Sequence, residues 1–118
     1  MMKVNVIYDL EKIEYNTLRF ILNNCLVKYT DEFKFIKNVN SREVDKLIEQ
    51  YANERNYELI TVPYLVSENQ LKSNIRRICK IADLNIIITG FDSESEELKS
   101  ILKDIDSFGN KYRIVRYS

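Results

Sequence analysis

The chain contains no histidine, and among its 118 residues it has only two glycines, one proline and two cysteines. Without histidine there is no Ser-His-Asp or Cys-His nucleophile system and no histidine-based metal site. Any catalysis would have to rest on carboxylates, tyrosine, lysine or arginine. Cys25 and Cys79 stand far apart among apolar neighbours, which indicates buried free thiols, and no C-x-x-C pair exists. We expect neither a metal site nor a resident cofactor.

Long apolar runs and an excess of charge are also missing. No apolar run approaches the roughly 20 residues that a membrane-spanning helix needs, and the first ten residues are too polar and too few for a signal peptide. We therefore expect a cytoplasmic protein with no membrane partner. The chain has 18 basic and 18 acidic residues, so its formal net charge is zero. A general nucleic-acid binder normally carries a basic excess, so general nucleic-acid binding is not expected.

The residues that are present favour one soluble α/β domain spanning 1–118. Hydrophobic residues make up 45% and charged residues 31% of the chain, which is the balance of a globular protein. The stretch "NIIIT" is a continuous run of mostly β-branched residues, as expected of a strand covered on both faces, and it is the best candidate for a central strand. Five β-like runs of this kind are found at 3–8, 32–37, 57–62, 84–89 and 112–117.

Four segments between these runs have a helical pattern. Residues 11–28 are expected to form a long apolar helix, and apolar residues recur at helical spacing over 44–52, 71–82 and 98–108. Gly109 follows the last of these segments, where a left-handed residue is favoured. Strands that alternate with helices imply parallel strands joined by right-handed crossovers. The sequence therefore predicts a three-layer Rossmann-like or flavodoxin-like domain with five mainly parallel strands and four helices.

In such sheets a ligand binds beyond the carboxyl ends of the strands, which here means the loops 8–11, 37–42, 63–68 and 89–95. Three aromatic residues are expected at this edge and could stack on a base, lid the core or form a protein-binding patch. The candidate ligand-binding residues are Tyr8, Asp9, Asn38, Asn40, Ser41, Arg42, Tyr64, Phe91, Asp92 and Ser93.

Two helix starts bear on whether an anion could bind at this edge. Arg42 precedes a helix whose N-terminus attracts anions, and its guanidinium could either contact a phosphate or form a salt bridge with Glu43 or Asp45. Asn40 with Glu43 has the spacing of a capping box, and so has Ser93 with Glu96. The acidic stretch 91–98 would repel a phosphate, so helix capping is the default interpretation of its polar residues.

Three stretches together resemble the SLOG superfamily of DprA- and LOG-like Rossmann domains, specifically its small stand-alone bacterial and phage members. The stretches are "NVNSREVD", "YANERNYELITVPY" and "RRICKIADLNIIITGFD", and they cover nearly the whole chain in order. On the family's glycine-rich phosphate motif, Arg42 and Asp45 match the arginine and the aspartate, whereas Val39, Asn40 and Glu43 occupy glycine positions. The resemblance implies the binding of a nucleotide or a nucleotide-derived ligand.

These observations leave three alternative functions to consider. The first is a non-catalytic SLOG-like module that binds a nucleotide-related small molecule or a protein partner, such as a host protein or a signalling nucleotide in a phage setting. The second is a carboxylate-dependent N-glycosidase similar to nucleoside deoxyribosyltransferases, with Glu96 or Glu97 as nucleophile and Asp9 or Asp92 orienting the sugar. The third is a structural subunit that forms a homo-oligomer through its helix faces.

Overall fold

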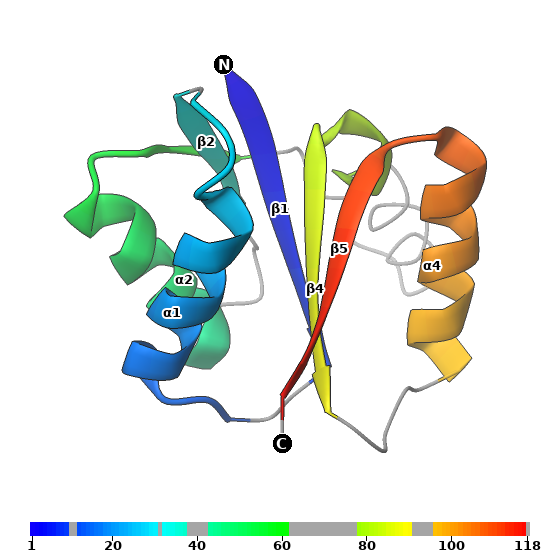
Figure 1. Cartoon of the computed structure of the whole chain (residues 1–118), viewed down its shortest axis with the longest axis horizontal. Coiled ribbons are helices and arrows are strands. Elements are labelled where there is room, and N and C mark those ends of the chain that lie inside the picture. Colours follow the sequence, from blue (N-terminus) through cyan, green and yellow to red (C-terminus); the bar gives the residue numbers. More distant parts are fainter. Residues whose placement is uncertain (10–11, 31, 38–42, 62–77, 91–95, 118) are drawn as a thin grey trace.

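The protein folds around one parallel five-stranded sheet (Figure 1). Its computed structural model describes residues 1–9, 12–30, 32–37, 43–61, 78–90 and 96–117. The strands follow each other across the sheet in the order β3-β2-β1-β4-β5, and every neighbouring pair is parallel. Their bounds are Met2–Asp9 for β1, Phe33–Lys37 for β2, Glu58–Thr61 for β3, Leu84–Gly90 for β4 and Lys111–Tyr117 for β5.

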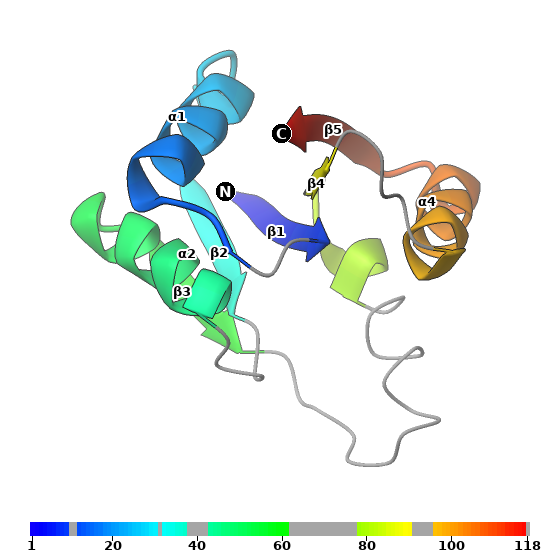
Figure 2. The same ribbon diagram turned by 90° about the horizontal axis from the view of Figure 1, so that it is seen from below.

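Helices cover both faces of this sheet. Helices α1 (Tyr15–Leu26) and α2 (Glu43–Glu54) lie on one face, and α4 (Glu96–Phe108) lies on the other together with the helical residues 78–81 (Figures 1 and 2). The three-layer, Rossmann-like α/β fold expected from the sequence is thereby confirmed. The strand order is that of the Rossmann fold, because a flavodoxin-like sheet has the order 2-1-3-4-5.

Helix boundaries depend on local backbone conformations. Helix α2 ends at Glu54, and Asn56, two residues later, is left-handed with φ 58°, so that the Tyr57 N–H reaches the Ala52 carbonyl at 2.9 Å. Gly109 has φ +75° directly after α4, as the sequence predicts. Helix α1 is shorter than the expected 11–28, because the described residues before Tyr15 are not helical and α1 ends at Leu26.

The apolar core has one part on each side of the sheet. On the α1 and α2 side, Phe35 and Ile86 pack with Leu18 and Tyr51. On the α4 side, Ile87 packs with Leu98, Ile105 and Cys79. Ile87 has no exposed surface, and its strand β4 lies between β1 and β5. The expectation that "NIIIT" forms an interior strand is therefore confirmed.

Two buried asparagines join β1 to β4. Asn5 lies opposite Asn85 in the register of the two strands, and its side-chain amide donates to Asn85 Oδ1 at 3.1 Å. The Asn85 amide in turn donates to the Cys79 carbonyl at 3.0 Å. Because buried polar groups need partners, this chain of bonds fixes the end of the helical segment 78–81 against the middle of the sheet.

Tyr51 joins α2 to α1. Its ring is buried, and its hydroxyl donates to Asn23 Oδ1 at 2.7 Å. The Arg55 guanidinium lies 4.1 Å from the centre of the Tyr51 ring and also donates to Asn23 Oδ1, at 2.9 Å. Burial raises the pKa of Tyr51 to about 12, although the nearby Arg55 cation opposes this shift. The neutral phenol is therefore the form that suits the folded state.

Candidate functional site

The strand order places a topological switch point between β1 and β4. From β1 the chain proceeds outward through β2 to β3, and then crosses to β4 on the other side of β1. The helices of the two halves therefore cover opposite faces of the sheet. In open α/β sheets of this kind, ligands bind at the carboxyl ends of the two strands beside the switch point, which here are β1 and β4. These ends are adjacent, since Asp9 at the end of β1 pairs with Thr89 near the end of β4.

Tyr8 lies at this position, next to the end of β1, as the sequence predicts. It pairs with Ile88 in the sheet. Its side chain is half-buried and packs against the core on the α1 and α2 side. Of the three roles considered for the aromatic residues at this edge, the contact of Tyr8 with the core is the one that the geometry supports.

Thr89 is the polar side chain at this edge that sequence analysis did not single out. It has no exposed surface, and its Oγ1 has no hydrogen-bond partner within the described residues. An unpaired buried hydroxyl costs stability. In a native protein such a group often binds a ligand or a water molecule, or has a functional role. Thr89 alternates with Ile88 along β4 and so shares the α4 side of the sheet with Ile87.

Most of the other predicted ligand-binding residues lie outside the described part of the chain. Asp9 is described as the last residue of β1, and its backbone pairs with Thr89. The residues outside the described ranges are Asn38, Asn40, Ser41, Arg42, Tyr64, Phe91, Asp92 and Ser93.

The two glutamates of the glycosidase hypothesis lie in the first turn of α4. Glu96 opens the helix, its side chain is 92% exposed, and its Oε1 forms an ion pair with Lys99 Nζ at 3.2 Å. Glu97 is helical. The exposed, ion-paired carboxylate of Glu96 is typical of the first turn of a surface helix, where the dipole favours negative charge.

Asp45 is a further residue that the sequence pattern does not reveal as buried. It is 3% exposed and lies in the first turn of α2, between the buried residues Val44 and Ile48. A carboxylate in the first turn is favoured by the helix dipole. The burial of Asp45 follows from how α2 packs on the sheet, with Val44 and Ile48 in the core.

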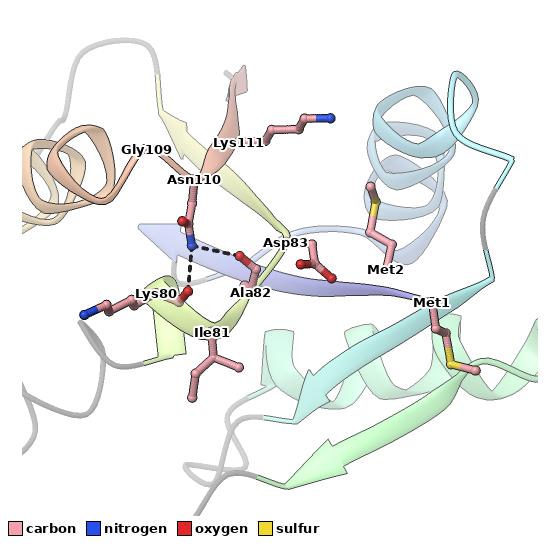
Figure 3. A pocket seen from close by; sticks show the side chains of 9 residues that line it. All are labelled: Met1, Met2, Lys80, Ile81, Ala82, Asp83, Gly109, Asn110 and Lys111. Carbon is pink, nitrogen blue, oxygen red and sulfur yellow. Dashed lines mark hydrogen bonds between the residues drawn. The ribbon is translucent and has the colours of Figure 1, made fainter.

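A pocket of about 450 Å³ lies at the opposite, amino edge of the sheet (Figure 3). The Asn110 side-chain nitrogen on its wall donates to the carbonyls of Cys79, Lys80 and Ala82 at 2.8, 2.8 and 2.9 Å. The Asp83 carboxylate accepts the Lys3 N–H at 2.8 Å. These hydrogen bonds hold the strand starts and the helical segment 78–81 together, so they give the wall of this pocket a structural role.

The described side chains offer little for metal or thiol chemistry. No group of three or more His, Cys, Asp or Glu within the described ranges could hold a metal ion. Both cysteines are buried and free. Burial, helped by the charge of Asp104, raises the pKa of Cys79 to about 12, and burial also raises the pKa of Cys25. Burial therefore favours the protonated form of both thiols, which is the less nucleophilic one. In the same part of the chain, no helix is long and apolar enough to span a bilayer.

Comparisons of the chain with protein-family models, with curated proteins and with solved structures found no match.

Proposed function

We propose that this protein is a non-catalytic, SLOG-like module that binds a nucleotide-related small molecule at the carboxyl edge of its sheet, between β1 and β4. The observation that carries the proposal is the switch point of the strand order, because ligands of open α/β sheets bind at that position. The resemblance of three stretches of sequence to the SLOG superfamily gives the ligand class.

The side chains at the switch point support a binding role. Tyr8 offers part of a ring beside the end of β1, and aromatic rings stack on bases. The buried hydroxyl of Thr89 would gain a partner from a polar ligand atom. The two side chains lie on opposite faces of the sheet, so a ligand that contacts both would have to lie across the carboxyl ends of β1 and β4.

The glutamates at the start of α4 fit a binding protein better than they fit an enzyme that transfers glycosyl groups. A glycosidase nucleophile acts in an enclosed site beside the sugar. The Glu96 side chain is almost fully exposed and pairs with Lys99 on its own helix. We therefore expect no release of base from any nucleoside or nucleotide by the wild-type protein. Base release that disappears when Glu96 and Glu97 are both replaced by glutamine would establish the enzyme instead.

The first experiment is a thermal-shift screen against nucleosides, mononucleotides, cyclic nucleotides and NAD derivatives. A ligand present at 100 times its Kd should add about 2.7 kcal/mol to the free energy of unfolding. The compound with the largest shift then goes to titration calorimetry with the wild type and with Thr89→Val, which keeps the shape of the side chain and removes the hydroxyl.

We expect Thr89→Val to weaken that ligand about tenfold, which corresponds to the loss of one hydrogen bond of about 1.4 kcal/mol. Thr89→Ser is the matched control, because it keeps the hydroxyl. Arg42→Ala tests the loop that resembles the family's phosphate motif, and it should weaken an anionic ligand by about 1.5–3 kcal/mol. If no compound in the screen raises the unfolding temperature, the proposed ligand class is wrong.

A further inference from the structure

The strand β5 forms one edge of the sheet, and its outer side pairs with no strand among the described residues (Figure 2). Its inner side pairs with β4 along all seven residues. An edge strand presents a row of backbone N–H and C=O groups that can pair with another extended segment. The strand at the opposite edge, β3, has only four residues. Of the two edges, β5 therefore offers the longer row of backbone groups.

The side chains of β5 alternate between the two faces of the sheet. Lys111 Nζ lies 5.8 Å from the centre of the Tyr29 ring, and Arg113 Nη1 is 3.4 Å from the Asn24 carbonyl. Val115 and Tyr117 are half-buried and pack against the core on the same side. We call these four residues the α1-side row: two cations in the first half of the strand, followed by two apolar residues in the second half.

The two cations of the α1-side row have no carboxylate partner within the described residues. Their contacts there are with an aromatic ring and with a backbone carbonyl. Lys28 adds a third positive charge, since its Nζ lies 5.2 Å from the centre of the same Tyr29 ring. The strand itself, "KYRIVRY", contains no acidic residue. Three cations thus lie around the start of an edge strand in a protein whose overall charge is zero.

We propose that the β5 edge is a docking site for an extended acidic segment of a partner protein, which adds to the sheet as a sixth strand. Side chains directly opposite each other on neighbouring strands lie on the same face, and opposite charges there attract. The partner segment should therefore carry acidic residues at two alternate positions beside Lys111 and Arg113. The next two positions of the same face should be apolar, beside Val115 and Tyr117.

The charge of β5 disfavours a second copy of this chain as the occupant. If a second copy paired through the same edge, its Lys111, Arg113 and Arg116 would lie close to the same three residues of the first copy. Like charges would then repel each other. Cations on an edge strand also discourage unselective pairing, so the same residues that repel other edges would select an acidic one. This docking site is on the far side of β4 from the proposed ligand position and does not depend on it.

The experiment is an NMR titration of the full chain with labelled heptapeptides. Glu-Thr-Glu-Thr-Val-Thr-Val matches the α1-side row for a parallel strand, and the reverse sequence matches it for an antiparallel strand. Each peptide has two controls: a version with lysine in place of glutamate, and a version with proline in place of the central threonine, which cannot pair normally in a strand. We expect one acidic peptide to bind at least ten times more tightly than both of its controls, with amide shifts concentrated on β5.

Charge variants decide whether the α1-side row is responsible. Lys111→Glu with Arg113→Glu should reverse the preference, so that the lysine peptide binds more tightly than the acidic one. Lys111→Gln with Arg113→Gln is a milder variant that should abolish the preference even if the reversal fails to fold. Lys46→Glu with Lys103→Glu makes the same charge change at exposed positions on α2 and α4 and should leave the preference intact.

Three results would overturn the proposal. The first is equal affinity of the wild type for acidic and lysine peptides, or no binding of either acidic peptide. The second is an acidic preference that survives the glutamine variant. The third is a dimer of the wild type in light scattering that β5 variants dissociate, since a second copy would then occupy the edge.

Discussion

The Asn5 side chain donates a hydrogen bond to the Asn85 side chain at 3.1 Å, across the boundary between the two halves of the sheet. Asn85 has no exposed surface, and Asn5 is 7% exposed. The two residues lie opposite each other in the sheet, Asn5 in the middle of β1 and Asn85 near the start of β4. The bond between the two asparagines favours one register, because a shift by one residue would break it and turn one of the two side chains to the other face of the sheet.

Replacing both of these asparagines together should cost less than the sum of the two single replacements. Asn85→Leu leaves the buried Asn5 amide with only the Cys79 sulfur, 3.9 Å away, as an acceptor, and it removes the donor to the Cys79 carbonyl. This should lower the free energy of unfolding by about 1–3 kcal/mol. The double variant Asn5→Leu, Asn85→Leu removes both ends of the bond, so its cost should be less than the sum of the single changes. Urea unfolding of the four proteins measures this coupling. Additive costs would show that the bond contributes nothing.

Asn110 should stabilise the protein through its donor group. Asn110→Ala removes the donor to three carbonyls, and we expect a loss of about 1–3 kcal/mol in the free energy of unfolding. Asn110→Asp should be worse than alanine at pH 7, because an ionised carboxylate faces the carbonyls, and it should recover at acidic pH when the carboxyl becomes a donor. Asn24→Ala is the control, since its exposed side chain donates to a single carbonyl. Equal stability of the alanine and aspartate variants at all pH values would contradict this role.

Ile87 should be among the most sensitive core positions. Ile87→Ala should lower the free energy of unfolding by about 2–5 kcal/mol, because it removes apolar contacts and leaves a cavity on the α4 side of the sheet. Ile81→Ala is the matched control, as Ile81 is 40% exposed and should change stability by less than about 0.5 kcal/mol. A loss at Ile87 as small as that at Ile81 would contradict its packing.

Tyr51 should make the protein less stable at alkaline pH. Its pKa is about 12 in the folded protein and about 10 in an unfolded chain. The folded state therefore holds the phenol proton more tightly, and this contribution is fully present below pH 10 and is lost as the pH rises toward 12. Tyr51→Phe should lose about 0.5–1.5 kcal/mol at pH 7 with the bond to Asn23. Between pH 10 and 12 its stability should fall less steeply than that of the wild type. Parallel pH profiles of the two proteins in urea unfolding would rule out the linkage.

The fold could be predicted from the sequence because local patterns determine most of its elements. The β-branched run that contains Ile87 has the composition of a doubly covered strand, and Gly109 has the conformational freedom that the end of α4 requires. The strand order could not be predicted, because the local sequence of β1 or β4 does not indicate which strands lie beside them in the sheet. The bond of Asn5 to Asn85 and the bond of Asn85 to the Cys79 carbonyl explain why an asparagine occurs in each of these two strands.

The candidate site could be predicted only as a region. The sequence places Tyr8 at the carboxyl edge, and it does lie there, but whether its ring faces the core or the solvent depends on how α1 and α2 pack. The sequence gives no reason to choose Thr89 as a ligand-binding residue, because threonine at the end of a β-branched run is usual for a strand. Its unpaired hydroxyl is a property of the three-dimensional surroundings. The predictions for Arg42 and for the other residues outside the described ranges stay predictions.

The pairing of β1 with β4 affects when the protein can fold during its synthesis. Asn5 and Asn85 are 80 residues apart in the chain, so a ribosome releases β1, β2 and β3 well before β4. Until then one side of β1, which ends up in the middle of the sheet, has no partner strand in the nascent chain. Closing so long a loop is slow, and an unpaired apolar strand is a template for wrong pairing. Cotranslational folding should therefore complete only after β4 has left the exit tunnel, and the nascent protein is most in need of a chaperone in that interval.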